Sequence, residues 1–376
     1  MFEPVSSRVS FPELEERILK NWSQKDVFKR SIENRRGGRR FTLYEGPPTA
    51  NGQPGIHHVL SRVFKDVIPR YKVMKGYYAP RIGGWDTHGL PVELEVEKEL
   101  GFKSKTDIEQ FGIAEFNRKC RESVFRYVND WNTLTERIGY WVDLDNAYVT
   151  MNNDYIESGW WVVKQLWDKG LVYQGHKVTP HCPRCGTSLS SHEVALGYEE
   201  NTKDPSVYVK FQVDRLSLSG ELQHFTDKPL SLLAWTTTPW TLPANTALAV
   251  AASAEYAVLD HGDEYLVLAA ALLENNGLGN ESRAGSVSGA SLVGLQYRPL
   301  YNPFEYAVPV SRLENGELKA VAEEELRYPV IAADYVSMED GTGIVHTAPA
   351  YGEVDYDSGR KHNLYFIHHV DLQGKV

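Results

Sequence analysis

The chain has 376 residues, of which 42% are apolar and 24% charged, enough for roughly two or three globular domains with sizeable cores. Its formal net charge of −10 argues against broad, nonspecific nucleic-acid binding, although local basic clusters could still contact RNA. No apolar run reaches the length of a membrane span, residues 1–38 lack the pattern of a signal peptide, and three cysteines are too few for a disulfide scaffold, so we expect a cytoplasmic protein.

The first part of the chain predicts a strand, a loop and a helix. After a leader helix over residues 11–31, the β-prone run Phe41–Tyr44 ends at a Gly/Pro-rich loop, residues 46–55. From Ile56 the apolar residues recur with a helical period, which predicts a helix with one buried stripe. Pro69 is expected to bend or end that helix, since proline removes a backbone donor.

Two histidines, His57 and His58, stand at the predicted helix start. A helix N-terminus offers free N–H groups and partial positive charge, so it binds phosphate, and imidazoles there could donate hydrogen bonds to phosphate oxygens. The loop has neither P-loop nor dinucleotide-fold glycine spacing. Taken alone, adjacent histidines are more often a helix cap or a surface pair, but the next cluster favours phosphate binding.

That next cluster follows a second predicted strand, Tyr77–Ile82. Residues 83–88 read Gly-Gly-Trp-Asp-Thr-His, with the two glycines in the turn, and residues 91–100 predict a helix that opens with proline. The order predicts a right-handed βαβ unit whose loops lie together at the carboxyl ends of parallel strands. Asp86 is then a candidate for binding a cationic group, with a plain helix cap as the alternative.

These motifs together resemble class I aminoacyl-tRNA synthetases, and among them the isoleucyl-tRNA synthetases. Residues 46–52 read Gly-Pro-Pro-Thr-Ala-Asn-Gly, and residues 84–93 read Gly-Trp-Asp-Thr-His-Gly-Leu-Pro-Val-Glu. Valyl and leucyl enzymes share the architecture but differ in the second motif. The similarity extends from about Phe11 to the end of the chain. One departure stands out: the family tetrad is His-Ile-Gly-His, whereas residues 55–58 read Gly-Ile-His-His.

The resemblance implies an α/β fold in which a Rossmann-like catalytic half-domain carries an inserted, β-rich barrel editing domain. It also implies ATP with Mg²⁺, isoleucine and tRNA(Ile) as ligands, and a monomeric full enzyme without membrane contact. The residues carried over by position are Gly46, Pro47, Asp86 and His88 for the amino acid, with Asp86 on its ammonium group, and Gly55, His57 and His58 for ATP, the two histidines also as catalytic groups.

Further helices are predicted at residues 107–141 and Tyr155–Lys169, where Trp160, Trp161 and Trp167 are expected to be packing residues. From about Val207 the pattern changes to short strands, which predicts a second, β-rich domain. Residues 273–292, rich in Gly, Ser and Asn, are expected to form a flexible surface loop. The strands are expected at Val207–Val213, Leu230–Trp235, Tyr256–Leu259, Tyr265–Leu268, Ala307–Val310 and Val330–Tyr335.

Between these regions, Cys182 and Cys185 form a Cys-x-x-Cys knuckle that points two thiolates at one metal, which is half of a tetrahedral zinc site. Cys120 lies on a predicted helix, and neither His181 nor His192 has convincing spacing. A redox pair and a metal-free turn stay open as alternatives. In the resembling family a second cysteine pair follows the inserted domain, so zinc binding is expected to need residues beyond this chain.

Two stretches of the β-rich domain carry unusual polar side chains. Residues 235–243 read Trp-Thr-Thr-Thr-Pro-Trp-Thr-Leu-Pro, and residues 341–350 read Gly-Thr-Gly-Ile-Val-His-Thr-Ala-Pro-Ala. A purely structural interpretation stays open, because Thr favours strands. The pair resembles the editing site of isoleucyl, valyl and leucyl enzymes, where an aspartate holds the ammonium group of a misattached amino acid. The pocket residues carried over by position are Thr236, Thr237, Thr238, Trp240, His346 and Asp355, with Asp355 as that aspartate.

The expected function is therefore isoleucine–tRNA ligation with hydrolytic editing of valyl-tRNA. Editing is needed because valine lacks only one methylene of isoleucine, which provides about 1–3 kcal/mol of discrimination, a limit described for this enzyme family. The expected domains are residues 1–181, half of the catalytic domain; 182–199, half of the zinc knuckle; and 200–376, the editing domain. The alternatives are a valine- or leucine-specific relative, or an inactive paralogue that only binds or edits tRNA. Because the family's Lys-Met-Ser-Lys-Ser loop is nowhere in the sequence, we expect a longer parent protein and a chain that is inactive alone.

Overall fold

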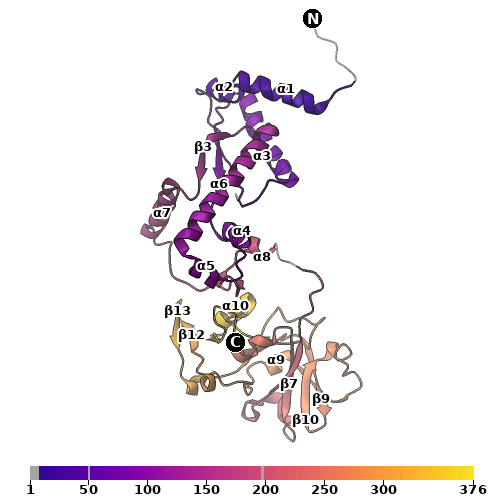
Figure 1. Cartoon of the computed structure of the whole chain (residues 1–376). Coiled ribbons are helices and arrows are strands. Elements are labelled where there is room, and N and C mark those ends of the chain that lie inside the picture. Colours follow the sequence, from indigo (N-terminus) through magenta and orange to yellow (C-terminus); the bar gives the residue numbers. More distant parts are fainter. Residues whose placement is uncertain (1–7, 50, 196–198, 315) are drawn as a thin grey trace. The chain divides into compact units, whose positions relative to one another are not determined.

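The computed structural model describes residues 8–49, 51–195, 199–314 and 316–376 (Figure 1). The chain divides into two compact units, Met1–Tyr173 and Gln174–Val376. The elements of the first unit are α1 (Phe11–Gln24), α2 (Val27–Glu33), β1 (Leu43–Tyr44), α3 (Ile56–Met74), β2 (Arg81–Trp85), α4 (Leu90–Leu100), α5 (Lys105–Phe111), α6 (Ile113–Arg137), β3 (Asp143–Val149) and α7 (Asn153–Asp168).

The strands of the first unit form one parallel sheet in the order β1-β2-β3. Helix α3 connects β1 to β2, so the predicted strand–helix–strand unit with parallel strands is confirmed. The leader region differs from the prediction, because Asp26 adopts a left-handed conformation (φ +46°) and separates α1 from α2. The long helix predicted over residues 107–141 is likewise interrupted, by Gly112 at φ +104° between α5 and α6.

Helix α3 starts at Ile56 as predicted, but it buries the opposite face. Its apolar stripe is exposed: Leu60, Phe64 and Ile68 are 62%, 69% and 53% exposed. The buried face carries Arg62 and Asp66 instead, because ion pairs of Asp66 with arginines and a hydrogen bond from Arg62 satisfy these charges inside the unit. The predicted buried stripe is therefore wrong for this chain.

Pro69 lies inside α3, which continues to Met74, so the proline does not end the helix, while the predicted bend stays a prediction. The proline is buried on the same face as Val73, and this burial offsets the single backbone hydrogen bond that proline removes. Gly76 follows the helix end with φ +84°, as expected of a helix-terminating glycine.

Strand β2 extends to Trp85, so Gly83 and Gly84 lie within the strand and do not form the predicted turn. Both glycines are needed there because β3 passes very close. A Cβ at Gly84 would lie 2.2 Å from the Tyr148 ring, and one at Gly83 would lie 2.9 Å from the Asp143 carbonyl oxygen. The glycine pair therefore lets two strands approach each other, a role that a sequence pattern does not separate from a turn.

Helix α7 begins two residues before and ends one residue before the predicted range Tyr155–Lys169, and its tryptophans do not pack in a core. Trp160, Trp161 and Trp167 are 70%, 63% and 66% exposed, and no residue of this helix is buried. The prediction that they are packing residues is wrong for this chain.

The second unit is β-rich, as predicted (Figure 1). Its elements are β4 (His181–Cys182), β5 (Thr187–Ser188), α8 (Ser191–Ala195), β6 (Val207–Gln212), β7 (Leu230–Thr236), β8 (Ala247–Val250), β9 (Glu255–His261), β10 (Glu264–Ala269), β11 (Ser282–Ser288), α9 (Gly289–Leu292), β12 (Val310–Glu314), β13 (Glu317–Ala320), β14 (Val330–Ala332), β15 (Ile344–Thr347), α10 (Glu353–Lys361) and β16 (Tyr365–Ile367).

Two sheets of this unit share one core. The five-stranded sheet has the order β11-β9-β10-β7-β6, and the three-stranded sheet has the order β14-β8-β15. Buried side chains of the first, such as Leu232, Val258 and Val267, belong to the same hydrophobic cluster as Leu248 and Ile344 of the second. A further sheet, β13-β12-β16, and the hairpin β4-β5 complete the described strands.

Two expectations for this unit are wrong. Residues 273–292 are not a plain loop, because they contain β11 and α9; Gly285 lies under the Phe225 ring, where a Cβ would come within 2.7 Å, and an irregularity in the pairing with β9 accommodates it. The strand expected at Ala307–Val310 begins only at Val310, since Ala307 has φ +55° and ends a 3₁₀ turn.

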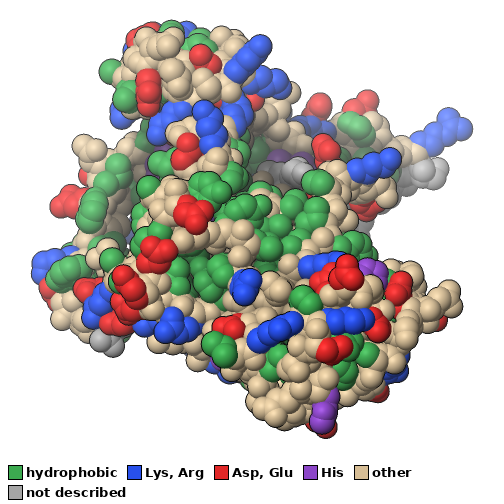
Figure 2. All heavy atoms as spheres, turned by 90° about the horizontal axis from the view of Figure 1, so that it is seen from below, with side chains coloured by type: hydrophobic (Ala, Val, Ile, Leu, Met, Phe, Trp, Pro, Cys, Tyr) green, Lys and Arg blue, Asp and Glu red, His purple; other side chains and the backbone are tan. Residues whose placement is uncertain are grey.

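No helix among the described residues is long and apolar enough to cross a membrane. On the face drawn in Figure 2, basic and acidic side chains are interspersed and do not gather in one basic patch.

Candidate functional site

The loops after the three strands of the first unit lie side by side. The backbone N–H of Asp86 donates to the Pro48 carbonyl oxygen at 3.1 Å, which joins the loops after β1 and β2. The loops after β2 and β3 meet where Thr87 and Thr150 share a hydroxyl–hydroxyl hydrogen bond of 3.1 Å, buried from solvent. The carboxyl ends of parallel strands thus form the edge at which α/β sheets bind ligands.

Asp86 stands on this edge, half-buried, while His88 is exposed. Helix α4 is capped by Gly89 at φ +90°, so the alternative in which Asp86 is a helix cap is wrong. A partly shielded carboxylate beside a loop backbone is suited to hold a cationic group. Gly46 and Pro47 belong to the neighbouring loop, and the Gly46 carbonyl oxygen accepts a hydrogen bond from Lys65 at 3.3 Å.

His58 is oriented by the protein. The Gly55 backbone N–H donates to its Nδ1 at 2.8 Å, so the ring proton sits on Nε2, which has no hydrogen-bond partner within the described ranges. Burial lowers the pKa of His58, and the neighbouring His57 and Arg62 lower that pKa further. A neutral imidazole with its N–H directed away from the helix cap is a donor suited to a phosphate oxygen.

His57 occupies the place that a side chain at residue 55 would need. An ideal Cβ on Gly55 would lie 2.8 Å from Cε1 and 2.9 Å from Nδ1 of His57. The His57 and His58 rings lie 3.8 Å apart, centroid to centroid. The glycine at 55 therefore accompanies the histidine at 57 for a steric reason, and the helix start still presents two imidazoles.

A polar network beneath this helix start was missed by the sequence reasoning. Buried Glu45 accepts hydrogen bonds from Lys65, at 2.5 Å, and from Tyr140. Trp131 donates from Nε1 to the Gly52 carbonyl oxygen at 3.0 Å and packs its ring edge on His58 at 4.5 Å. Trp131 thereby holds both the glycine loop and the histidine.

Arg62 belongs to the same network, with its guanidinium 4.8 Å from the centre of the Trp131 ring. It is buried, and burial lowers its pKa. A signal was available in the sequence, because Arg62 and Asp66 follow His58 at intervals of four residues and so share its helix face.

The two cysteines of the knuckle lie on the β4-β5 hairpin. The Gly186 N–H donates to the Cys182 carbonyl oxygen at 2.8 Å, and Gly186 has φ +62°, so the turn is tight. The backbone N–H of Cys185 lowers the pKa of Cys182, whereas burial raises the pKa of Cys185. The described residues contain no group of three or more His, Cys, Asp or Glu that could hold a metal ion, and a zinc role of the cysteine pair stays a prediction.

The Thr-rich stretch and His346 are joined by a buried hydrogen-bond chain. Asn245 Nδ2 lies 2.9 Å from Nδ1 of His346, and His346 Nε2 lies 2.8 Å from Oγ1 of Thr241, which donates to the Thr238 carbonyl oxygen. Tyr297 fixes the Asn245 amide by donating to its Oδ1 at 2.6 Å. Nδ1 is therefore the acceptor and Nε2 the donor of a neutral ring.

Both ring nitrogens of His346 are used within the protein, and burial lowers its pKa to about 4. Its hydrogen bonds connect the ring to Asn245 and, through Thr241, to the Thr-rich stretch, and its predicted place in an editing pocket stays a prediction. Thr237 and Thr238 are exposed, and Thr236 accepts a hydrogen bond from the Thr238 N–H at 3.1 Å, which shapes the turn that presents them.

Asp355 lies in the first turn of α10, close in space to the end of β15. Its Oδ2 accepts a hydrogen bond from the Ala348 N–H at 2.9 Å, and burial raises its pKa. His346 and Ala348 are two residues apart, so the structure brings together the three features that the sequence singled out: the Thr-rich stretch, His346 and Asp355.

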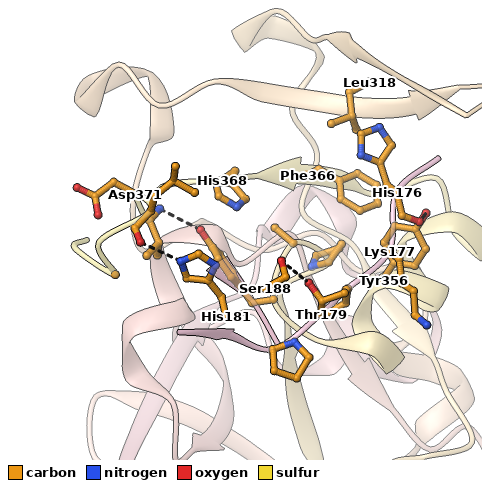
Figure 3. A pocket seen from close by; sticks show the side chains of 18 of the residues that line it. His176, Lys177, Thr179, His181, Ser188, Leu318, Tyr356, Phe366, His368 and Asp371 are labelled. Carbon is orange, nitrogen blue, oxygen red and sulfur yellow. Dashed lines mark hydrogen bonds between the residues drawn. The ribbon is translucent and has the colours of Figure 1, made fainter. Parts of the chain in front are cut away.

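A cavity of about 1,090 Å³ lies within the second unit (Figure 3). Its lining includes Trp240, but not the residues Thr236, Thr237, Thr238, His346 and Asp355. Trp240, Ala350 and Tyr351 form one part of its lining, and the segment His176–Pro183 forms another. Figure 3 shows His176, Thr179 and His181 of that segment around the cavity, with Thr179 hydrogen-bonded to Ser188 at 3.1 Å. The Trp240 side chain is 46% exposed.

Comparison with known families assigns the chain. The model of the family described as tRNA synthetases class I (I, L, M and V) matches residues 17–350. The chain belongs to this class I synthetase family. The resemblance inferred from the two loop motifs is thereby confirmed, together with the α/β class of the fold.

The curated relatives of this class I synthetase chain include isoleucine–tRNA ligases. That of Dehalococcoides mccartyi is 68% identical over 381 residues, covering 100% of this chain and 38% of the relative. That of Thermus thermophilus is 51% identical over 382 residues, covering 100% and 34%. The chain therefore spans a little over a third of the length of these relatives. A solved LeuRS–tRNA–LeuAMS complex from Agrobacterium radiobacter is similar at 18% identity and a TM-score of 0.36, over 93% of this chain and 43% of that one.

Proposed function

We propose that this chain is part of an isoleucine–tRNA ligase that activates isoleucine with ATP, transfers it to tRNA(Ile) and hydrolyses valyl-tRNA. The observation that carries the proposal is the 68% identity to an isoleucine–tRNA ligase along the whole chain, both loop motifs included. The structural support is the convergence of the loops after β1 and β2 at the helix start with His57 and His58. The relatives favour isoleucine over valine or leucine as the substrate.

In the activation step, a carboxylate oxygen of isoleucine attacks the α-phosphorus of ATP, the new O–P bond forms, and the bond to the bridging oxygen breaks as pyrophosphate leaves. Asp86 holds the ammonium group of the amino acid, with Gly46, Pro47 and His88 around it. The Nε2–H group of His58 donates a hydrogen bond to phosphate oxygens, and His57 lies beside it. The main contributions are positioning and charge stabilisation.

In the transfer step, a terminal hydroxyl of tRNA attacks the carbonyl carbon of the adenylate and AMP leaves. In the hydrolytic step, water attacks the ester carbonyl carbon of valyl-tRNA at the second site, the bond to the ribose oxygen breaks, and valine and tRNA with a free terminal hydroxyl leave. Asp355 holds the ammonium group of valine there, while Thr236, Thr237, Thr238 and Trp240 orient the terminal nucleotide and the water. Asp355 suits this role because a cation would replace the proton that burial favours on its carboxyl group.

We assign residues 1–181 to the catalytic half-domain, 182–199 to half of a zinc knuckle and 200–376 to the editing domain. ATP enters with Mg²⁺. The Cys182–Cys185 pair supplies two thiolates toward a zinc ion and needs two further ligands, and the proposed mechanism uses no zinc. Because the proposed enzyme acts on tRNA, ATP and a free amino acid, we expect it in the cytoplasm and expect no membrane partner.

The test is amino-acid activation by the full-length protein that contains this chain. ATP–pyrophosphate exchange should depend on isoleucine, with valine activated more weakly and leucine not at all. Purified valyl-tRNA(Ile) should be deacylated faster than isoleucyl-tRNA(Ile). Leucine- or valine-dependent exchange at the highest rate would instead favour a related specificity, and deacylation without any exchange would favour a paralogue that only edits.

A further inference from the structure

Three aromatic side chains, Trp240, Tyr351 and His369, form what we call the aromatic clamp. His369 Nε2 lies 2.9 Å from the Trp240 carbonyl oxygen, which can only accept, so Nε2 carries the ring proton. His369 Nδ1 lies 3.1 Å from the Tyr351 hydroxyl and accepts a hydrogen bond from it. The Tyr351 ring meets the Trp240 ring edge-on at 5.1 Å.

The clamp is closed by the backbone. The Tyr351 hydroxyl accepts hydrogen bonds from the N–H groups of His369 and Val370 at 2.8 and 3.2 Å. One hydroxyl thus satisfies two backbone donors just after β16 while it fixes the tautomer of His369. Both ring nitrogens of His369 and the Tyr351 hydroxyl thus have hydrogen-bond partners within the protein, which favours a rigid connection.

The clamp joins the two walls of the proposed hydrolytic site. Trp240 follows the Thr-rich stretch directly, in the 3₁₀ turn Pro239–Ala244. Tyr351 lies in the loop between β15 and α10, whose first N–H, that of Ala348, is held by Asp355. Moving His369 or Tyr351 would therefore change the distance between the threonines and the aspartate.

We propose that His369 and Tyr351 are positioning residues that set the width of the hydrolytic pocket and so its selectivity between valine and isoleucine esters. This inference rests on the proposed editing function. A pocket that accepts valine and rejects isoleucine must discriminate one methylene, so a small displacement of one wall suffices to lose the rejection. The buried His346 chain holds the Thr-rich stretch through Thr241, and two members of the clamp, Trp240 and Tyr351, line the cavity.

The experiment measures single-turnover deacylation of valyl-tRNA(Ile) and isoleucyl-tRNA(Ile) by the full-length protein and its Tyr351→Phe and His369→Ala variants. Tyr351→Phe keeps the ring on Trp240 and removes only the hydroxyl. Tyr256→Phe is the matched control, since the Tyr256 hydroxyl accepts from the Ala251 N–H at 2.9 Å and donates to the Gly343 carbonyl oxygen at 2.7 Å, away from the clamp. Isoleucine-dependent exchange reports on the integrity of the other site.

Both clamp variants are expected to lower the ratio of valyl to isoleucyl hydrolysis at least fivefold, with a rise in isoleucyl-tRNA hydrolysis, and to leave ATP–pyrophosphate exchange within twofold. Tyr256→Phe is expected to lower the unfolding temperature without changing the ratio. An unchanged ratio in both clamp variants would overturn the inference, even if they are less stable. If the natural protein hydrolyses neither ester, the proposed editing function itself fails and this inference falls with it.

Discussion

The tetrad Gly-Ile-His-His at residues 55–58 provides the sharpest test of the proposed site of isoleucine activation. Since a Cβ at residue 55 would lie 2.8 Å from His57, Gly55→Ala must turn that imidazole away from its present position. Gly55 itself has φ −106°, a conformation open to any residue, so the backbone accepts an alanine there. The nearest atoms that its Cβ would meet are those of the His57 ring. An off-rotamer ring costs about 0.5–1.5 kcal/mol, which predicts a loss of about two- to tenfold in kcat/KM for isoleucine activation.

A larger side chain should do more. Gly55→His would displace the His57 ring from the helix start, and loss of one hydrogen-bond donor to a developing charge costs about 2.7–4 kcal/mol, or roughly 10²–10³-fold. The double variant Gly55→His/His57→Gly restores the common tetrad and should return to within about tenfold of the natural protein. We expect the natural full-length protein to activate isoleucine at ordinary rates, measured by ATP–pyrophosphate exchange.

Two controls separate the ring contact from other effects. Gly52→Ala lies in the same loop, where a Cβ meets nothing within 4 Å, and should stay within twofold of the natural rate. Alanine is also a poorer helix cap than glycine, and this effect would persist in Gly55→Ala/His57→Gly, whereas the steric effect would disappear. An inactive natural protein combined with an active Gly55→His/His57→Gly variant would refute the reasoning, since the exchange would then be damage.

The remaining predictions concern four other places. His58→Ala in the full-length protein should cost more than about 2 kcal/mol in kcat/KM for exchange, and a smaller loss would remove His58 from the phosphate site. Asp355→Ala should abolish valyl-tRNA hydrolysis with isoleucine activation nearly unchanged, and equal loss in both assays would indicate misfolding. The pair Cys182 and Cys185 should bind zinc weakly in this chain alone, so stoichiometric zinc that survives a mild chelator would contradict the half-site. Burial lowers the pKa of His346 to about 4 from 6.5, so as the pH falls the unfolded chain takes up a proton before the folded chain does. The free energy of unfolding, measured with urea, should therefore fall by on the order of 3 kcal/mol as the pH drops from 6.5 toward 4. A flat profile would show that protonation of the His346 ring does not destabilise the folded protein.

Periodicity located α3 and its first residue but not the face that it buries. Apolar spacing predicts that the apolar face of a helix is the covered one, whereas this chain buries the face with Arg62 and Asp66. The choice between the faces depends on partners far away in the sequence, such as Thr135 for Arg62 and Arg81 for Asp66. A local pattern does not contain those pairs.

Glycine is ambiguous for a related reason. The pair at 83–84 was interpreted as a turn, and it is a strand segment that Tyr148 crosses closely. The composition of residues 273–292 predicts a loop, yet Ser282–Ser288 within them pair with β9, and Gly285 there makes room for the Phe225 ring. In both places the missing side chain serves a neighbour from another part of the chain, which composition does not reveal.

The candidate site shows the same division between residue identity and residue state. The motifs selected His58 and His346 equally, yet the structure separates them by how many ring nitrogens the protein uses. In His58, Nδ1 accepts a hydrogen bond from the Gly55 N–H, and Nε2 has no partner in the described part of the chain. The Nε2–H group can therefore donate a hydrogen bond to a ligand. In His346, hydrogen bonds to Asn245 and Thr241 occupy both ring nitrogens, and the ring can act only through these residues.

No sequence motif selected His369, and its two hydrogen bonds connect Trp240 to Tyr351. A histidine with one open nitrogen is suited to chemistry and one with none to positioning, and that distinction follows from tertiary hydrogen bonds that the sequence does not carry.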